Sequence, residues 1–126
     1  MNTPINTDNA PAPLGPYNQA ILAGNTLYIS GQIAIEPKTN QMITQDIKIE
    51  TTQVLDNLSA IIKEANYSLT DVVKVSIFIA NMDDFAQINE VYATYFNGAA
   101  APARECVAVK TLPKNVNIEI SAIAHR

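Results

Sequence analysis

The sequence has very little of the side-chain chemistry that enzymes use most often. It contains one cysteine, Cys106, and one histidine, His125, in 126 residues. A lone cysteine excludes an internal disulfide and a cysteine-rich metal site, and it is typical of a reducing compartment. A lone histidine next to the C-terminus argues against a histidine-based triad and against a multi-histidine metal site. Any chemistry would therefore depend on carboxylates, an arginine or lysine, hydroxyls or the single thiol.

Positive charge is also scarce. Eight Lys and Arg residues stand against twelve Asp and Glu residues, the net charge is −4, and the cations are scattered singly. Because phosphate binding depends on clustered cations, we expect no nucleic-acid partner. No apolar run approaches the roughly 18–20 residues of a membrane span, so we expect no membrane partner. The segment 1–16 is polar, rich in proline and free of cations, unlike a signal or transit peptide, and we expect a cytoplasmic protein.

The composition is that of a globular protein, with 48% hydrophobic and 16% charged residues, and it fits one domain over residues 1–126. Alternating apolar residues predict strands, and apolar residues spaced by three and four predict helices. The predicted strands are 17–22, 27–35, 72–80, 104–109 and 117–124, and the predicted helices are 46–65 and 85–96. This order indicates an α+β fold in which both helices pack on one face of a mixed sheet. The second face, with Ile35, Val75, Val107 or their alternates, would stay partly apolar, which predicts an oligomer.

Three residues near the C-terminus could carry chemistry. If the last two strands pair as a hairpin through residues 112–116, Arg104 and Glu119 lie on neighbouring strands, with Cys106 on the side of Arg104. A guanidinium suits a substrate carboxylate because its fork donates two parallel hydrogen bonds, and a nearby glutamate could activate water. Each residue also has a structural interpretation. Arg104 could be a salt-bridge partner, Glu119 the solvent face of an edge strand, and Cys106 a small buried apolar residue.

At these positions the sequence closely resembles the Rid family of reactive intermediate deaminases, also called the YjgF family. The resemblance spans essentially the whole chain. It is carried by Gly15-Pro16-Tyr17-Asn18-Gln19-Ala20, Ile29-Ser30-Gly31-Gln32-Ile33, Pro102-Ala103-Arg104-Glu105-Cys106-Val107, Leu112-Pro113-Lys114 and Ile118-Glu119-Ile120-Ser121-Ala122-Ile123-Ala124. Asp84-Phe85 and Asn89 in the second predicted helix belong to the same pattern.

The resemblance implies a chorismate-mutase-like fold that assembles as a homotrimer, with active sites between subunits. It implies hydrolysis of enamines and imines, such as 2-aminoacrylate, to 2-keto acids and ammonia, with no metal and no cofactor. By position, Arg104 would bind the substrate carboxylate, and Glu119 would hold the attacking water. The backbone of Cys106 would contact the substrate nitrogen region. The pocket would be shaped by Tyr17, Ser30, Gly31 and Asn89.

Three further expectations accompany this hypothesis. The charge of Arg104 should hold down the pKa of Glu119 against burial, so that Glu119 is ionised at neutral pH. Glu105 replaces a residue that is usually small or apolar in the family, and on a regular strand it should point away from Arg104. The short, alanine-rich loop 97–101 leaves substrate preference open. Two alternative functions also remain, a non-catalytic sensor of 2-keto acids and a ribonuclease, and the acidic charge argues against the second.

Overall fold

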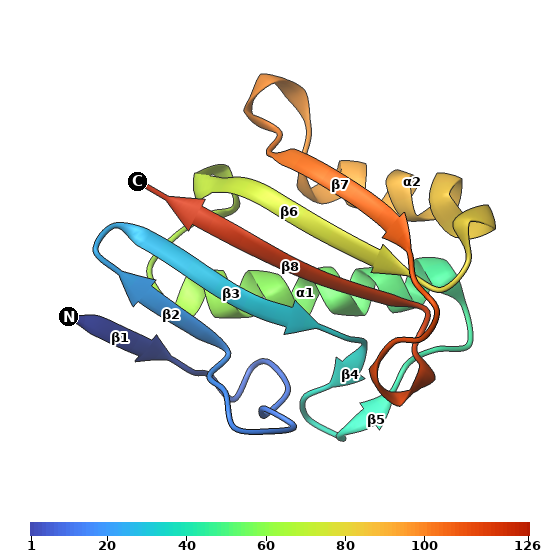
Figure 1. Ribbon diagram of the computed structural model, residues 1–126, viewed down its shortest axis with the longest axis horizontal. Helices are drawn as coiled ribbons and strands as arrows, with labels where there is room; N and C mark the ends of the chain where they lie inside the picture. The colour runs from blue at the N-terminus through green and yellow to red at the C-terminus, as the bar shows by residue number, and fades with distance from the viewer.

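A computed structural model describes all of residues 1–126. Six strands form one mixed sheet, and both long helices lie on the same side of it (Figure 1). The α+β fold predicted from the sequence is therefore confirmed. No helix is long and apolar enough to cross a membrane.

The large sheet has the strand order β1-β2-β3-β8-β6-β7. All neighbouring pairs are antiparallel except β6 and β7, which run parallel. A separate two-stranded ribbon pairs β4 (Ile35–Glu36) with β5 (Gln41–Met42). The strands of the large sheet are β1 (Asn2–Ile5), β2 (Ala20–Ala23), β3 (Thr26–Gln32), β6 (Val72–Ile79), β7 (Ala103–Ala108) and β8 (Ile118–His125).

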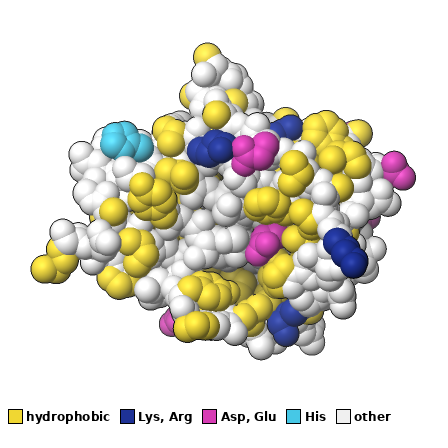
Figure 2. All heavy atoms as spheres, in the orientation of Figure 1, with side chains coloured by type: hydrophobic (Ala, Val, Ile, Leu, Met, Phe, Trp, Pro, Cys, Tyr) yellow, Lys and Arg dark blue, Asp and Glu magenta, His cyan; other side chains and the backbone are white.

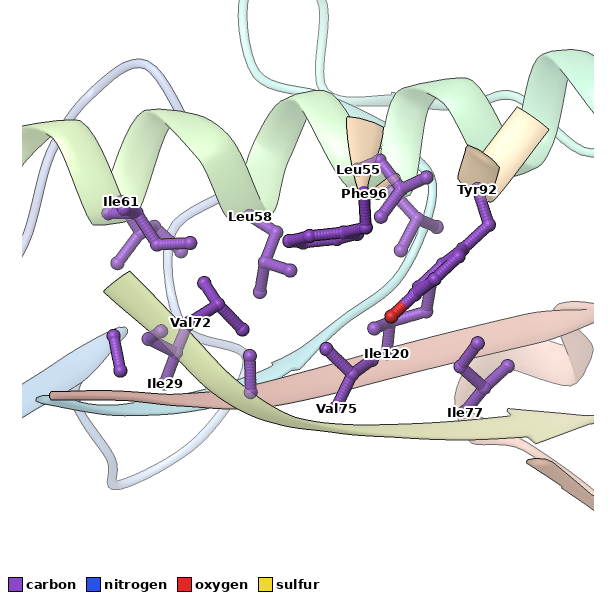
Figure 3. Close-up of a cluster of buried hydrophobic side chains, with 14 of the residues drawn as sticks. Ile29, Leu55, Leu58, Ile61, Val72, Val75, Ile77, Tyr92, Phe96 and Ile120 are labelled. Atoms are coloured by element: carbon purple, nitrogen blue, oxygen red, sulfur yellow. The ribbon is translucent and has the colours of Figure 1, made fainter. Parts of the chain in front are cut away.

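The two helices cover the sheet with the apolar stripes visible in the sequence. Helix α1 (Ile47–Glu64) begins after Asp46, whose carboxylate accepts hydrogen bonds from the backbone N–H groups of Lys48 and Ile49. Helix α2 (Phe85–Tyr95) connects β6 to β7. Between helices and sheet lies the main hydrophobic core, part of which is shown in Figure 3, and it includes Leu55, Leu58, Val75, Ile77, Tyr92, Phe96 and Ile120.

The predicted hairpin between the last two strands is wrong. Strand β8 lies between β3 and β6, and β7 pairs only with β6 at the edge of the sheet. The physical reason is the crossover through α2, which returns the chain to the same end of the sheet and makes β7 parallel to β6. The turn at 112–116 then carries the chain past β6 instead of reversing it beside β7.

The sheet face away from the helices, which we call the open face, is only partly polar. Side chains alternate along β6 and β7, so Val75 and Arg104 lie on the helix face, whereas Ser76 and Glu105 lie on the open face. Val107 is exposed, as predicted, but Val75 is buried in the core, which corrects its assignment to the second face. In the orientation of Figure 2, hydrophobic side chains gather in several separate patches.

Candidate functional site

The residues predicted to form the site fall into two groups on opposite faces of the sheet. Arg104 and Cys106 lie on the helix face of β7, beside Asn89 of α2. Glu119 pairs with Phe78 on the open face, where it approaches Gly31. In one chain the candidate residues therefore form two separate groups, which we call the arginine half-site and the glutamate half-site.

In the arginine half-site, helix α2 fixes the guanidinium of Arg104. An Nη1 hydrogen of Arg104 is donated to Oδ1 of Asn89 at 2.8 Å. The guanidinium carbon lies 4.8 Å from the centre of the Tyr92 ring and 5.7 Å from that of Phe85. Such cation–π contacts stabilise the charge without using its N–H donors. Most of the five donors of Arg104 therefore stay available for an anion.

Cys106 shares the helix face with Arg104, as predicted. Burial raises the pKa of its thiol above the ordinary value of 9.0, and the charge of Arg104 lowers it by less. The thiol is therefore protonated at neutral pH, which does not suit a nucleophile. The backbone of Cys106 has a different environment. Because the N–H of Val109 donates to Ile79 of β6 and amide directions alternate along a strand, the peptide groups of Cys106 point to the free edge of the sheet.

In the glutamate half-site, the carboxylate of Glu119 fills the space beside a glycine. A Cβ atom placed on Gly31 would lie 2.6 Å from Oε2 of Glu119, closer than real contacts allow. The carboxylate borders a cleft of about 250 Å³ whose other walls are mostly apolar. The lining residues are Leu14, Gly15, Pro16, Tyr17, Gly31, Ile33, Pro113 and Glu119.

The electrostatics of Glu119 differ from the sequence-based expectation. Burial raises the pKa of this carboxyl above its ordinary value, and no charged group of the same chain opposes the effect. The expected influence of Arg104 on the pKa of Glu119 is therefore absent within one chain. The cause is the strand order, because β6 separates β7 from β8 and the two side chains lie on opposite faces.

Tyr17 and Ser30 have different positions relative to the cleft. Tyr17 lines it, and its hydroxyl accepts a hydrogen bond from the N–H of Leu14 at 3.1 Å. Ser30 does not line the glutamate cleft, and its hydroxyl donates to the carbonyl of Asn18 at 2.7 Å. Ser30 instead joins the N-terminal loop to β3 and borders a second hollow on the open face.

Glu105 points away from Arg104, as predicted for a regular strand. Its carboxylate lies 3.0 Å from the ammonium of Lys74 and accepts a hydrogen bond from Ser76, both on the open face. Hydrogen bonds from these two partners lower the pKa of Glu105. Glu105 therefore does not neutralise Arg104 within the chain.

Sequence reasoning missed several residues that shape the half-sites. Tyr92 was visible only as part of the apolar stripe of α2, and Phe85 as part of that stripe and of the family resemblance, although both also flank Arg104. Leu14, Ile33 and Pro113 line the glutamate cleft but come from three separate loops. The nearest signal was the resemblance itself, because Ile33 and Pro113 belong to two of its blocks and Leu14 directly precedes a third, although none of the three had been assigned to the site.

A family model described as endoribonuclease L-PSP matches residues 7–126. The chain belongs to this family. This family also includes proteins described as Rid proteins, so the resemblance to the Rid family seen in the sequence is confirmed.

Three members of the family illustrate the likeness. A RutC family protein of Pyrococcus horikoshii is 56% identical over 126 residues, which cover 100% of this chain and 99% of that protein. A 2-iminobutanoate/2-iminopropanoate deaminase of Escherichia coli is 44% identical over 128 aligned residues, which cover 100% of this chain and 99% of that protein. A structure of Escherichia coli TdcF with bound serine is 40% identical with a TM-score of 0.92, and 98% of each chain is covered.

Proposed function

We propose that this chain is a deaminase that hydrolyses 2-imino acids, and the enamines in equilibrium with them, to 2-keto acids and ammonia. The observation that carries the proposal is the pair of half-sites. One has a fixed guanidinium with free donors, and the other has a single carboxylate in an apolar cleft. The deaminase name of the Escherichia coli relative supports the reaction, and serine bound to TdcF supports a ligand with a carboxylate.

The two half-sites must come from different subunits if they bind one molecule. Within one chain they lie on opposite faces of the sheet, with β6 between their strands. We infer that the chain assembles as a homotrimer in which the arginine half-site of each subunit faces the glutamate half-site of the next. A closed ring of this kind uses one heterologous contact three times. The partner's Arg104 would then oppose the effect of burial on the pKa of Glu119 and keep that carboxylate ionised at neutral pH.

In this arrangement each residue has one task. Arg104 binds the substrate carboxylate through two charge-assisted hydrogen bonds, and the carbonyl of Cys106 accepts a hydrogen bond from the imine nitrogen. Glu119 orients a water molecule and removes its proton as the water oxygen bonds to the imine carbon. The same proton then passes to nitrogen and gives a carbinolamine, which carries a hydroxyl and an amino group on one carbon. Glu119 next removes the hydroxyl proton and delivers it to nitrogen as the carbonyl forms and the C–N bond breaks, so that a keto acid and ammonia leave. Fixing both reactants replaces an encounter with bulk water by a step of defined geometry.

Subunit complementation tests this proposal directly. Arg104→Ala and Glu119→Gln should each abolish acceleration in an assay in which a serine dehydratase supplies the enamine and keto-acid release is timed. When the two inactive variants are unfolded, mixed in equal amounts and refolded together, some interfaces receive an intact arginine from one variant and an intact glutamate from the other. With random assembly, about one quarter of the sites should recover.

The controls for this experiment are the two variants refolded separately, which should stay inactive. No recovery in a mixture that assembles normally would show that both residues act from the same chain, or that they do not act together. An unchanged rate in Arg104→Ala would end the deaminase proposal.

A non-catalytic sensor is the competing function, because the structure of TdcF shows a relative binding the stable amino acid serine. Turnover separates the two functions. Both functions allow Glu119→Gln to bind pyruvate in calorimetry. Only the deaminase function predicts that the unmutated chain accelerates imine hydrolysis and that Glu119→Gln does not.

A further inference from the structure

The wall of the glutamate cleft is built from a loop that has almost no regular structure of its own. Between the end of β1 at Ile5 and the start of β2 at Ala20, the chain forms only turns and bends. This loop nevertheless supplies residues 14–17 to the cleft. It also contains prolines 11, 13 and 16, which have no backbone N–H to donate.

The side chain of Gln19 supplies the missing hydrogen bonds. It is only 2% exposed, and every polar group of its amide is used. Its Nε2 lies 3.1, 3.3 and 2.8 Å from the carbonyl oxygens of Thr7, Ala10 and Pro11, so its two hydrogens are shared among three acceptors. Its Oε1 accepts a hydrogen bond from the N–H of Thr7 at 2.7 Å. One buried side-chain amide thus contacts the loop backbone at Thr7, Ala10 and Pro11.

The backbone of Gln19 ties the same loop to the sheet. Its N–H donates to Oδ1 of Asn6 at 3.0 Å, and its carbonyl accepts a hydrogen bond from the N–H of Ser30 at 2.9 Å. Ser30 precedes Gly31, the glycine that makes room for Glu119. Gln19 therefore joins the loop that forms one wall of the cleft to the strand that forms its floor.

Gln19 anchors the segment 12–18 at both ends, and at the second end Ser30 adds a hydrogen bond from its hydroxyl to the carbonyl of Asn18. The segment's preceding neighbour, Pro11, is hydrogen-bonded to the Gln19 side chain, and its following neighbour is Gln19 itself. Inside it, the contact between Tyr17 and Leu14 closes a local turn but makes no link to the sheet. The position of Tyr17 over the cleft thus depends on the anchors at the two ends.

We propose that Gln19 is a positioning residue for the reaction, which holds the loop wall of the glutamate cleft in the shape that receives substrate. The inference rests on the proposed function of that cleft. Gln19 is fully hydrogen-bonded within the chain, so it acts through the wall rather than by touching substrate. Without its amide, the wall would be formed in only a fraction of molecules, and the apparent affinity for substrate would fall by that fraction.

This mechanism predicts a particular kinetic pattern in two variants. Gln19→Glu keeps the shape and the acceptor toward Thr7 but cannot donate to the three carbonyls when ionised, and Gln19→Met loses all four hydrogen bonds. In both, KM for the imine should rise by about tenfold, while kcat per folded molecule changes by less than about twofold. Protonation of the new carboxyl restores one donor, so the rise in KM of Gln19→Glu relative to the unmutated chain should shrink toward acidic pH.

Tyr67→Phe is a matched control, because it removes another buried bond to a loop carbonyl. The hydroxyl of Tyr67 donates to the carbonyl of Asn25 at 2.7 Å, at the end of β3 away from Gly31. This variant should unfold at a lower temperature with unchanged KM. If the Gln19 variants behave in the same way, losing only active fraction at unchanged KM, Gln19 is merely structural and the inference is overturned.

Hydrogen exchange separates failure of this inference from failure of the proposed function. Amides of residues 8–18 should exchange faster in the Gln19 variants than in the unmutated chain, and pyruvate should bind to the variants with a weaker Kd in calorimetry. If the unmutated chain shows no deaminase activity, the proposed function fails while these two measurements still test Gln19. Unchanged exchange and unchanged Kd would overturn the role of Gln19 even in an active deaminase.

Discussion

At the scale of single residues, Glu119 lies so close to Gly31 that the glycine has no room for a methyl group. The Cβ of Gly31→Ala would lie 2.6 Å from Oε2 and 2.8 Å from Cδ of Glu119. The end of a glutamate side chain is flexible, so the protein should fold with the carboxylate displaced. A shift of about 1 Å at a reacting group can cost about 100-fold in rate, and we expect a loss of that size in kcat/KM with little change in Tm.

Gly15→Ala provides the comparison for this prediction. Gly15 lines the same cleft, but its added Cβ would meet only the Tyr17 ring at 3.7 Å, an ordinary contact. This variant should keep kcat/KM within a few-fold of the unmutated chain. Equal activity losses in the two alanine variants would show that cleft volume, and not the position of Glu119, limits the reaction.

The thiol of Cys106 gives a second prediction at the residue scale. Burial raises its pKa above 9.0, and Arg104 partly opposes this. Thiolate absorbance should therefore titrate with a midpoint above pH 9, and Arg104→Ala should move the midpoint further upward because the favourable charge is lost. A midpoint below pH 8 would show a stabilised thiolate and would reopen the interpretation of Cys106 as a nucleophile.

At the scale of elements, the start of α1 depends on Asp46. Its Oδ1 accepts hydrogen bonds from the N–H groups of Lys48 and Ile49 at 2.8 and 3.1 Å. Asp46→Ala should lower the free energy of unfolding by about 1 kcal/mol, measured by urea denaturation, because these N–H groups lose their acceptor. Asp46→Asn keeps an acceptor and should cost much less. Equal losses in both variants would assign the effect to charge at the helix terminus instead.

The elements themselves could be predicted from local patterns, because each long element carries a complete repeat of apolar residues. Both helices and the strands at 72–79, 103–108 and 118–125 lie within one or two residues of their predicted bounds. The pattern weakens where the backbone is irregular. At Val73 a register shift between β6 and β8 turns the side chain outward, so that valine is exposed although it fits the alternation.

Strand order was not predictable in the same way, and the site depends on it. Local periodicity indicates that 103–108 and 118–125 are strands, but it does not say that β8 enters the sheet between β3 and β6. The hairpin hypothesis brought Arg104 and Glu119 together within one chain, and the structure separates them. The Gln19 network was hidden for a related reason, because its partners are backbone carbonyls, which leave no mark on residue type.

At the scale of the whole molecule, the two separated half-sites and the partly apolar open face predict assembly. Light scattering coupled to size exclusion should give a mass about three times that of the 13.7 kDa chain. The temperature of unfolding should rise with protein concentration, because association stabilises the folded chain by mass action. A monomer at micromolar concentration would contradict both the trimer and the shared site.

The two borders of the sheet differ in how well they are protected once a subunit is alone. The outer border at β1 contains Pro4, which removes one donor from an exposed row of peptide groups. The border at β7 has no proline, and Val107 is exposed on it. A subunit released from its assembly should therefore be more open to strand addition by another chain at β7 than at β1.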